Sequence, residues 1–224
     1  MKLTDVQQEQ FNRYYELLIE WNEKINLTAI TDRNEVWVKH FEDSLSIDRI
    51  IDMSNVKSVI DVGTGAGFPG IPLKIMYPDI ELTLLDSLDK RLRFLQAVID
   101  ELGLCNVKTI HGRAEDIARE EEHRAKYDLC VSRAVASLPV LCELCIPFVK
   151  AGGSFVAYKS EKAEEEKALA GRAIDILGGV IEDFVTFDLS GSEYSRTLIR
   201  IKKVKQTDIK YPRRAGVPSK KPLI

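Results

Sequence analysis

The sequence predicts an α/β protein with a doubly wound, largely parallel sheet that is preceded by helices. From Lys57 onward, short apolar runs alternate with helical segments of ten or more residues, a pattern typical of parallel strands covered by helices. The length of 224 residues suits one such domain with an extension rather than two large domains. With 45% apolar and 30% charged residues, the composition excludes wholesale disorder and fibrous structure.

Residues 1–52 are predicted to form a small helical cap. Thr4-Asp5-Val6-Gln7 has the form of a capping box, which begins a helix. Apolar residues then recur at spacings of three and four, which predicts one buried helical stripe: Phe11, Tyr14, Leu18, Trp21 and Ile25. A second helical segment is expected from about Val36 to Ile50.

Residues 53–205 are predicted to form the sheet domain. Five strands are expected at Val59–Val62, Ile80–Asp86, Val107–Ile110, Tyr127–Ser132 and Ser154–Tyr158. A helix from about Leu88 to Leu102 should end at Gly103, a residue suited to a helix C-terminus. Two later extended segments, Val180–Leu189 and Thr197–Val204, are joined by a short polar stretch, Gly191-Ser192-Glu193. Because no helix separates them, they predict an antiparallel pair that completes the sheet.

Residues 206–224 are predicted to form a basic C-terminal tail. From Lys202 to the end, eight Lys or Arg and one Asp give a charge of +7, so the other 201 residues carry −10. A basic tail on an acidic body is typical of contact with nucleic acid, although a merely solvated tail is an equally good interpretation. The Pro- and Gly-rich stretch Tyr211–Pro218 is expected to be neither strand nor helix.

The remaining composition predicts neither a metal site nor a membrane segment. The four cysteines are too few for a disulfide framework, and Cys142 and Cys145 are expected to be buried on one face of a helix. The three histidines are too scattered to bind a metal. No run approaches the roughly 20 apolar residues of a membrane helix, and the first residues lack the apolar core of a signal peptide. We therefore expect a cytoplasmic protein.

The most informative motif is Asp61-Val62-Gly63-Thr64-Gly65-Ala66-Gly67-Phe68-Pro69-Gly70, between the first expected strand and a helix. Gly63, Gly65 and Gly67 would let the chain turn sharply and let a ligand approach its backbone. The spacing alone fits NAD as well as S-adenosylmethionine. The Asp61 carboxylate would attract an ammonium group but repel a pyrophosphate, and the prolines remove N–H donors that phosphates need. A zwitterionic cofactor without phosphates is therefore favoured.

Polar residues also follow other expected strands. Asp86 ends the second strand, where it would accept hydrogen bonds from ribose hydroxyls, although a helix N-terminal acid is a competing interpretation. Arg133 follows the fourth strand and Lys159 ends the fifth. Ligands bind at this carboxyl edge of open α/β sheets, so both are candidates for a site.

Together these motifs resemble those of the bacterial small-subunit rRNA guanine-N7 methyltransferases, also called glucose-inhibited division protein B. The motifs that carry the resemblance are the glycine loop, Leu85-Asp86-Ser87-Leu88, Gly112-Arg113-Ala114-Glu115, Val131-Ser132-Arg133-Ala134, His40-Phe41-x-Asp43-Ser44-Leu45 and the stretch Tyr211–Pro218. The resemblance thus covers nearly the whole chain.

The resemblance implies a class I S-adenosylmethionine-dependent methyltransferase fold with an antiparallel last strand. It implies methyl transfer to N7 of one guanine in 16S rRNA, either free or within a small-subunit precursor. It places the cofactor against Gly63 and Phe68, with Ala114 and Glu115 near the adenine and Arg133 beside the site of methyl transfer.

The implied chemistry agrees with the absence of an obvious catalytic dyad. Guanine N7 has an in-plane lone pair, so the enzyme needs no general base and contributes mainly orientation, worth roughly 7–11 kcal/mol. Arg133 is expected to position a guanine edge or a phosphate, the alternative being an ordinary strand-end arginine. RNA contacts are expected from Lys159 and from three tail residues: Arg213, Arg214 and Lys220.

Two other functions remain open at this point. A nicotinamide-dependent dehydrogenase would share the fold, but Asp61 and the prolines of the glycine loop disfavour it. A non-catalytic RNA-binding module for ribosome assembly would explain the basic tail but not the glycine loop. The chain is expected to act as a monomer.

Overall fold

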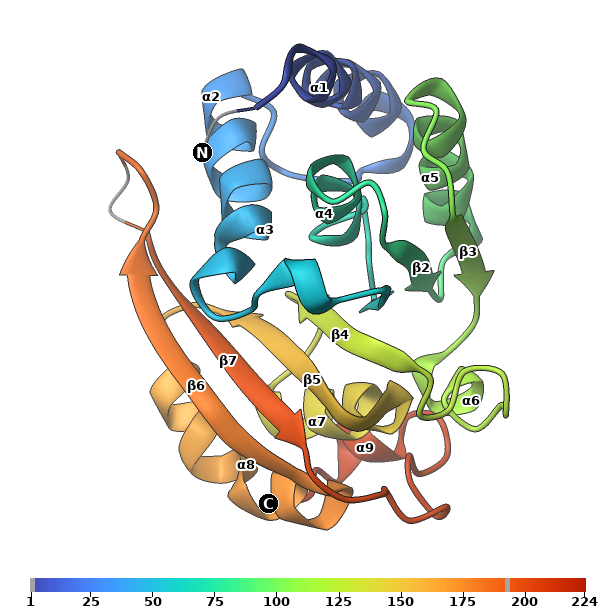
Figure 1. Ribbon diagram of the computed structural model, residues 1–224, viewed down its shortest axis with the longest axis vertical. Coiled ribbons are helices and arrows are strands. Elements are labelled where there is room, and N and C mark those ends of the chain that lie inside the picture. The colour runs from blue at the N-terminus through green and yellow to red at the C-terminus, as the bar shows by residue number, and fades with distance from the viewer. Residues whose placement is uncertain (1–2, 192–193) are drawn as a thin grey trace.

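The computed structural model describes residues 3–191 and 194–224, which form a seven-stranded sheet in the order β3-β2-β1-β4-β5-β7-β6 (Figure 1). The strands are β1 (Ser58–Val62), β2 (Glu81–Asp86), β3 (Val107–His111), β4 (Tyr127–Arg133), β5 (Val149–Lys159), β6 (Gly179–Asp188) and β7 (Ser195–Lys203). The first five run parallel, whereas β7 is antiparallel to both β5 and β6. The predicted fold class and the antiparallel closing pair are confirmed. The expected connection Gly191–Glu193 lies partly outside the described residues.

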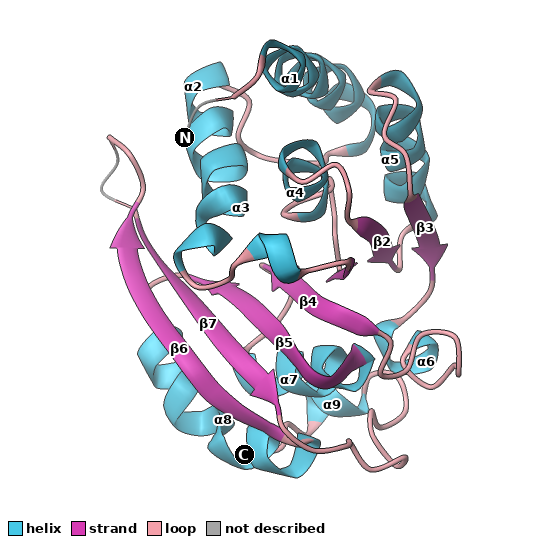
Figure 2. Cartoon of the chain, viewed as in Figure 1, coloured by secondary structure: helices cyan, strands magenta, loops and turns pink. Residues whose placement is uncertain are grey.

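Helices cover both faces of the sheet (Figure 2). One face carries α1 (Asp5–Ile25), α4 (Gly70–Met76) and α5 (Asp89–Glu101), and the other carries α7 (Leu138–Cys145) and α8 (Ala163–Leu177). Successive strand residues point to opposite faces, so Val59 enters the first core and Ile60 the second. A short helix, α6 (Ala114–Ile117), follows β3. Both layers leave the carboxyl ends of the parallel strands available for a site.

The N-terminal segment is helical as predicted, but its second part is irregular. Helix α1 begins with the predicted capping box of Thr4 and Gln7. The segment predicted at Val36–Ile50 comprises α2 (Arg33–Val36), a π-helix (Trp37–Glu42), α3 (Asp43–Leu45) and a 3₁₀ turn (Ser46–Arg49), and a second 3₁₀ turn (Met53–Asn55) precedes β1.

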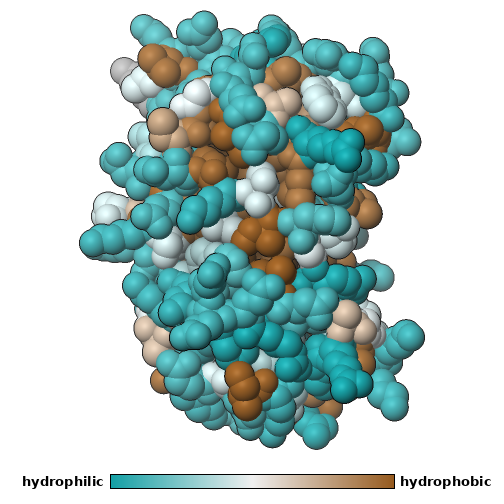
Figure 3. All heavy atoms as spheres, turned by 90° about the vertical axis from the view of Figure 1, so that its right-hand side faces the viewer, coloured by the Kyte–Doolittle hydropathy of each residue, from teal (hydrophilic) through white to brown (hydrophobic). Residues whose placement is uncertain are grey.

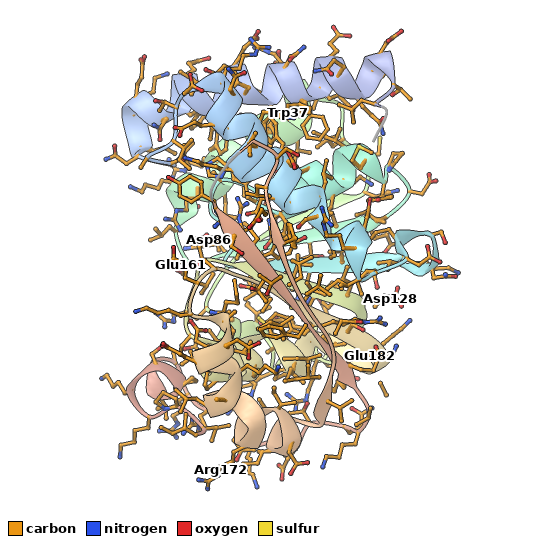
Figure 4. The ribbon with its side chains drawn as sticks, turned by 90° about the vertical axis from the view of Figure 1, so that its left-hand side faces the viewer. Trp37, Asp86, Asp128, Glu161, Arg172 and Glu182 are labelled. Carbon is orange, nitrogen blue, oxygen red and sulfur yellow. The ribbon has the colours of Figure 1, made fainter. Side chains whose placement is uncertain are left out.

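These N-terminal helices share one hydrophobic core with the sheet domain. Trp37 lies beneath α1 (Figure 4), where its ring centroid is 5.5 Å from that of Phe11. Phe11 and Tyr14 belong to the same core as Ile71 of α4 and Phe94 of α5. The boundary expected near residue 52 stays a prediction, but residues 3–52 do not pack as a separate body.

Residues 206–224, here called the C-terminal strap, pack along α7 and α6. The strap contains one helical turn, α9 (Val217–Lys220), which lies beside α7 (Figure 1). The prediction that no residue of Tyr211–Pro218 is helical is therefore wrong for its last two residues. Pro218 is compatible with the first turn of a helix, where its missing N–H costs no hydrogen bond. Arg124 donates hydrogen bonds to the carbonyls of Thr207 and Tyr211 and so holds the strap in place.

The surface and the cysteines agree with a globular protein. On the side of α5 and β3, hydrophilic residues cover most of the molecule and leave small apolar patches between them (Figure 3). Cys130, Cys142 and Cys145 are buried free thiols, as predicted for the last two. In the described part of the chain, no helix has the length and apolar character needed to cross a membrane. Nor do the described His, Cys, Asp and Glu residues form a group of three or more that could hold a metal ion.

Candidate cofactor loop and active site

The glycine loop connects β1 to α4 and needs its glycines for two different reasons. Gly63, Gly65 and Gly67 all have positive φ values of +71°, +60° and +93°, which other residues rarely adopt. A Cβ on Gly67 would lie 2.7 Å from the Tyr14 hydroxyl, so this glycine also lets α1 pack against the loop. By contrast, a Cβ on Gly65 would have only the Gly63 carbonyl oxygen within reach, at 4.0 Å. The backbone at Gly65 is therefore open to a ligand.

Six amide groups of this loop are already bonded inside the protein. The amides of Gly63 and Thr64 donate to Leu85 O, and those of Gly67 and Phe68 donate to Thr64 O. The Gly65 amide donates to Asp86 Oδ2, and the Gly70 amide donates to Asp61 Oδ2. A dinucleotide needs such N–H groups free for its pyrophosphate. The loop thus favours a cofactor without phosphates, as predicted from the prolines.

Asp61 holds the loop together from the end of β1. Its Oδ2 accepts hydrogen bonds from the Thr64 hydroxyl at 2.7 Å and from the Gly70 amide at 2.9 Å. Its buried Oδ1 has no hydrogen-bond partner among the described residues. Burial raises the pKa of Asp61 to about 6, against the lowering effect of the two hydrogen bonds. A buried carboxylate with an unpaired oxygen fits a cofactor that brings a positive charge.

Asp86 joins the end of β2 to the same loop. Its Oδ2 accepts from the Gly65 amide at 2.9 Å and pairs with Arg91 at 3.3 Å, and its Oδ1 accepts from the Leu88 amide at 2.9 Å. Asp86 is therefore both a helix N-terminal acid and a neighbour of the open backbone at Gly65. The structure thus shows the helix N-terminal role, and the ribose contact stays a prediction.

Ala114 and Glu115 begin α6, beyond the end of β3. The amide of the preceding Gly112 donates to Asp86 O at 3.1 Å, which places this turn next to β2. Glu115 is 3% exposed, and its Oε1 accepts from the Gly216 amide at 2.9 Å and from Arg113 at 3.3 Å. Burial raises the pKa of Glu115, but these hydrogen bonds outweigh burial and hold it below its usual range. The C-terminal strap thus contacts the turn that the resemblance assigns to adenine.

Arg133 lies where the glycine loop meets the N-terminal segment. Its Nη1 donates to Asp43 Oδ2 at 2.6 Å and to the Lys39 carbonyl at 3.3 Å, and its Nη2 is 3.3 Å from His40 Nδ1. The guanidinium also lies 5.1 Å from the ring centroid of Phe68. Arg133 is therefore held by Asp43 of α3 and by the π-helix that precedes it, and π-helices are often found at functional sites.

The ring of Phe68 packs against the guanidinium of Arg133. Its ring is 6% exposed and stacks on His40, with centroids 4.6 Å apart. Burial, reinforced by the charge of Arg133, lowers the pKa of His40 to about 3, so this imidazole is neutral near pH 7. Neutral His40 can accept a hydrogen bond from Arg133 rather than repel it. Phe68 thus lies at the candidate site, where it contacts both Arg133 and His40.

A cavity of about 320 Å³ opens beside Arg133, large enough for a small ligand. Its lining includes His40, Asp43, Tyr158 and Arg196. Arg196 lies 3.4 Å from Asp43 Oδ1, so one buried carboxylate pairs with two arginines. None of these four lining residues was assigned a functional role from the sequence. The signal for two of them was the motif His40-Phe41-x-Asp43, one of the motifs that carry the family resemblance.

The four residues predicted to bind RNA are not brought together. Lys159 lines the cavity, but its side chain is only 9% exposed and is paired with Glu166. Arg213, in the strap, donates to the buried Glu143 through Nε at 2.8 Å and Nη2 at 2.6 Å, so its guanidinium is occupied. Arg214 and Lys220 are exposed on the same strap. Of the predicted set, these two have the accessibility that a phosphate contact needs.

Comparison with known proteins agrees with this geometry. Residues 7–196 match the family model described as rRNA small subunit methyltransferase G. A protein of that name from Clostridium botulinum (strain Loch Maree / Type A3) is 51% identical over 223 residues, covering 100% of this chain and 93% of the relative. The corresponding protein from Lachnoclostridium phytofermentans is 54% identical, with the same coverage of both chains.

Solved structures with low sequence identity share the fold. TrmK from M. capricolum in complex with S-adenosyl-homocysteine has a TM-score of 0.55 at 16% identity, covering 74% of this chain and 69% of that one. TYW2 from M. jannaschii in complex with AdoMet has a TM-score of 0.56 at 16% identity, covering 74% and 76%. At such identities the likeness is one of architecture.

Proposed function

The chain belongs to the family of rRNA small subunit methyltransferase G, and on that premise we propose that it transfers a methyl group from S-adenosylmethionine to N7 of a guanine in 16S rRNA. The observation that supports this most directly is the position of Arg133. On one side Arg133 contacts Phe68 of the glycine loop. On the other side it lines the cavity that His40, Asp43 and Tyr158 also line. A methyl donor on the loop and a base in the cavity would meet beside this arginine.

The cofactor would be held by the residues that follow β1, β2 and β3. We assign Asp61, Gly63, Gly65, Gly67 and Phe68 to the first wall of its site, Asp86 to the ribose, and Ala114 and Glu115 to the adenine side. When bound, S-adenosylmethionine supplies a methyl group activated by a sulfonium centre. The unpaired Asp61 Oδ1 and the open backbone at Gly65 both fit this positively charged, phosphate-free group.

The protein contributes position and charge rather than proton transfer. Arg133 is the catalytic residue in this proposal, because its planar guanidinium can donate to O6 of guanine, the acceptor beside N7. Asp43 and the π-helix carbonyls keep the guanidinium in place, so little reorganisation is needed when the base enters. No residue has to remove a proton, since the N7 lone pair is available at neutral pH.

Neither alternative function explains the site as well. A dehydrogenase would need free loop amides for a pyrophosphate, and six of the loop amides are bonded within the protein. A purely RNA-binding module would not need the open, positive-φ backbone at Gly65 next to Asp86.

Methyl transfer with labelled S-adenosylmethionine tests the proposal. Free 16S rRNA, an assembly precursor and intact small subunits would serve as substrates, and the labelled base would be mapped by primer extension after N7-specific cleavage. We expect one labelled guanine in 16S rRNA, and loss of label in Arg133→Ala with retained cofactor binding. Label on another atom or another RNA would contradict the proposal.

The proposal extends to the form in which the protein acts. We propose a cytoplasmic monomer that binds 16S rRNA or a small-subunit precursor, with Arg214 and Lys220 among its phosphate contacts. Light scattering of the free protein and of its RNA complex tests the monomer, and the relative labelling rates of the three substrates identify the preferred one.

A further inference from the structure

The loop of residues 134–137 joins Arg133 to α7 and touches both halves of the site. Ala134 has φ +57°, a conformation that is unfavourable for a residue with a Cβ. Next to it, Val135 lies against the glycine loop, because a Cβ built on Gly63 would be only 2.5 Å from Val135 Cγ2. The loop thus sets the spacing between Arg133 and the cofactor wall at Gly63.

Two residues outside the loop hold it in this conformation. Lys159, at the end of β5, donates through Nζ to the Ala136 carbonyl at 2.7 Å and pairs with Glu166 Oε2 at 2.5 Å. Glu166, in the first turns of α8, accepts the Leu138 amide at 2.6 Å. One ion pair therefore ties down both sides of residue 137, where the loop enters α7.

We propose that the pair Lys159–Glu166 is a positioning device for methyl transfer, which holds the loop of residues 134–137 so that Arg133 and Gly63 keep their reactive spacing. This inference rests on the proposed function. Strained backbone persists only where its surroundings determine it, and here the surroundings are the bonds at Ala136 and Leu138. Misplacement of a reacting group by about 1 Å can cost on the order of 100-fold in rate.

The same geometry changes the role expected for Lys159. Its ammonium is largely buried and bonded to Ala136 and Glu166, so it does not present a free charge to an RNA phosphate. The sequence suggested an RNA contact because Lys159 ends a strand at the carboxyl edge of the sheet. It did not show that Glu166, seven residues later on the next helix, would lie within reach.

Lys159→Met, Lys159→Arg and Glu166→Gln test the proposal, with the exposed Lys162→Met as the matched control. We expect Lys159→Met to lower kcat by about 10- to 100-fold at saturating RNA, with the slope of log RNA affinity against log salt unchanged. Lys159→Arg keeps the charge and the donors and should recover most of the rate. Glu166→Gln should lower kcat in the same direction, and the double variant should be no slower than Lys159→Met alone. Lys162→Met should behave as the unsubstituted protein.

Three outcomes would overturn the inference. A salt slope that falls by roughly 0.7–0.9 in Lys159→Met, with unchanged kcat, would make Lys159 an RNA contact. Lower melting temperatures with unchanged kcat and cofactor affinity would make the pair merely structural. If Lys159→Met fails to fold, an unchanged kcat in Glu166→Gln would exclude the device. If the unsubstituted protein methylates no rRNA, the proposed function itself fails. In that case, an altered cofactor affinity in these variants would still show whether the pair positions the loop of residues 134–137 against the cofactor site.

Discussion

Asp61 is one buried side chain that connects the structure of the glycine loop to the proposed cofactor site. The sequence placed it correctly, before a glycine loop, and predicted its charge effect on a ligand. It could not show that one oxygen is used for Thr64 and Gly70 while the other has no hydrogen-bond partner in the described chain, since that depends on how the loop folds back. The same holds for His40 and Asp43, whose importance depends on Arg133, more than 80 residues away.

We predict that cofactor affinity depends on pH through Asp61. Its native pKa of about 6 exceeds its usual value, so the folded protein binds this proton more tightly than the unfolded chain does. Asp61 therefore favours folding at low pH, and that contribution is lost as the pH rises from about 4 to 6. A cationic cofactor prefers the carboxylate, so its affinity should fall about fourfold between pH 7.5 and pH 5.5. Calorimetry should show a flat profile in Asp61→Asn; an equal fall in that variant would assign the effect to another group.

At the scale of elements, the sheet and its helices were predictable, but the contacts between distant elements were not. The bounds of α5 and of β1 to β4 agree with prediction within one residue or two, because periodicity and glycine stops are local signals. The π-helix at Trp37–Glu42 has no such local signal. Nor does the sequence show that α1 would contact the glycine loop, which lies some 50 residues further along the chain.

Helix α1 gives a direct test of that contact. The buried Tyr14 hydroxyl donates to the Ala66 carbonyl in the glycine loop. Tyr14→Phe leaves this carbonyl without its donor, which should cost about 1–3 kcal/mol of stability and weaken cofactor binding by several-fold. Tyr15→Phe is the matched control, since its hydroxyl donates to Thr31 O, away from the loop. Equal cofactor affinities in the two variants would show that α1 does not support the site.

The strap tests a second long-range contact. Arg213 is a quarter exposed in its side chain and pairs with Glu143, which is fully buried. Removing one partner of such a pair leaves a buried charge, and here we expect Arg213→Ala to lower the free energy of unfolding by about 3 kcal/mol. The neighbouring Arg214→Ala removes an exposed charge and should change stability by less than about 0.5 kcal/mol. Urea titrations compare the two; similar small losses would mean that water replaces Arg213 readily.

At the scale of the whole molecule, the C-terminal strap connects two predicted sites, the RNA contacts and the adenine side, that the sequence analysis treated separately. The charge distribution fitted an RNA-binding tail and a merely solvated tail equally well, and neither kind of tail would affect the cofactor site. In the structure, Arg214 and Lys220 are exposed, but the Gly216 amide between them donates to Glu115 on the predicted adenine side. Net charge is a sum along the chain and carries no information about which backbone groups are bonded.

We therefore predict that two kinds of strap variant separate these functions. Gly216→Pro removes the amide donor and cannot adopt the native φ of +79°, so Glu115 loses its hydrogen bond. Loss of such a charge-assisted bond, worth about 1.5–3 kcal/mol, should weaken S-adenosylmethionine binding by about 10- to 100-fold while the RNA salt slope stays the same. The double variant Arg214→Ala/Lys220→Ala should do the opposite, because each lost phosphate contact lowers the slope by roughly 0.7–0.9 and leaves Glu115 untouched. Calorimetry with the cofactor and filter binding of 16S rRNA from 50 to 200 mM salt measure both effects. If Gly216→Pro binds the cofactor normally, the strap packs against α6 and α7 without supporting the adenine side, and its contribution is limited to RNA binding and stability.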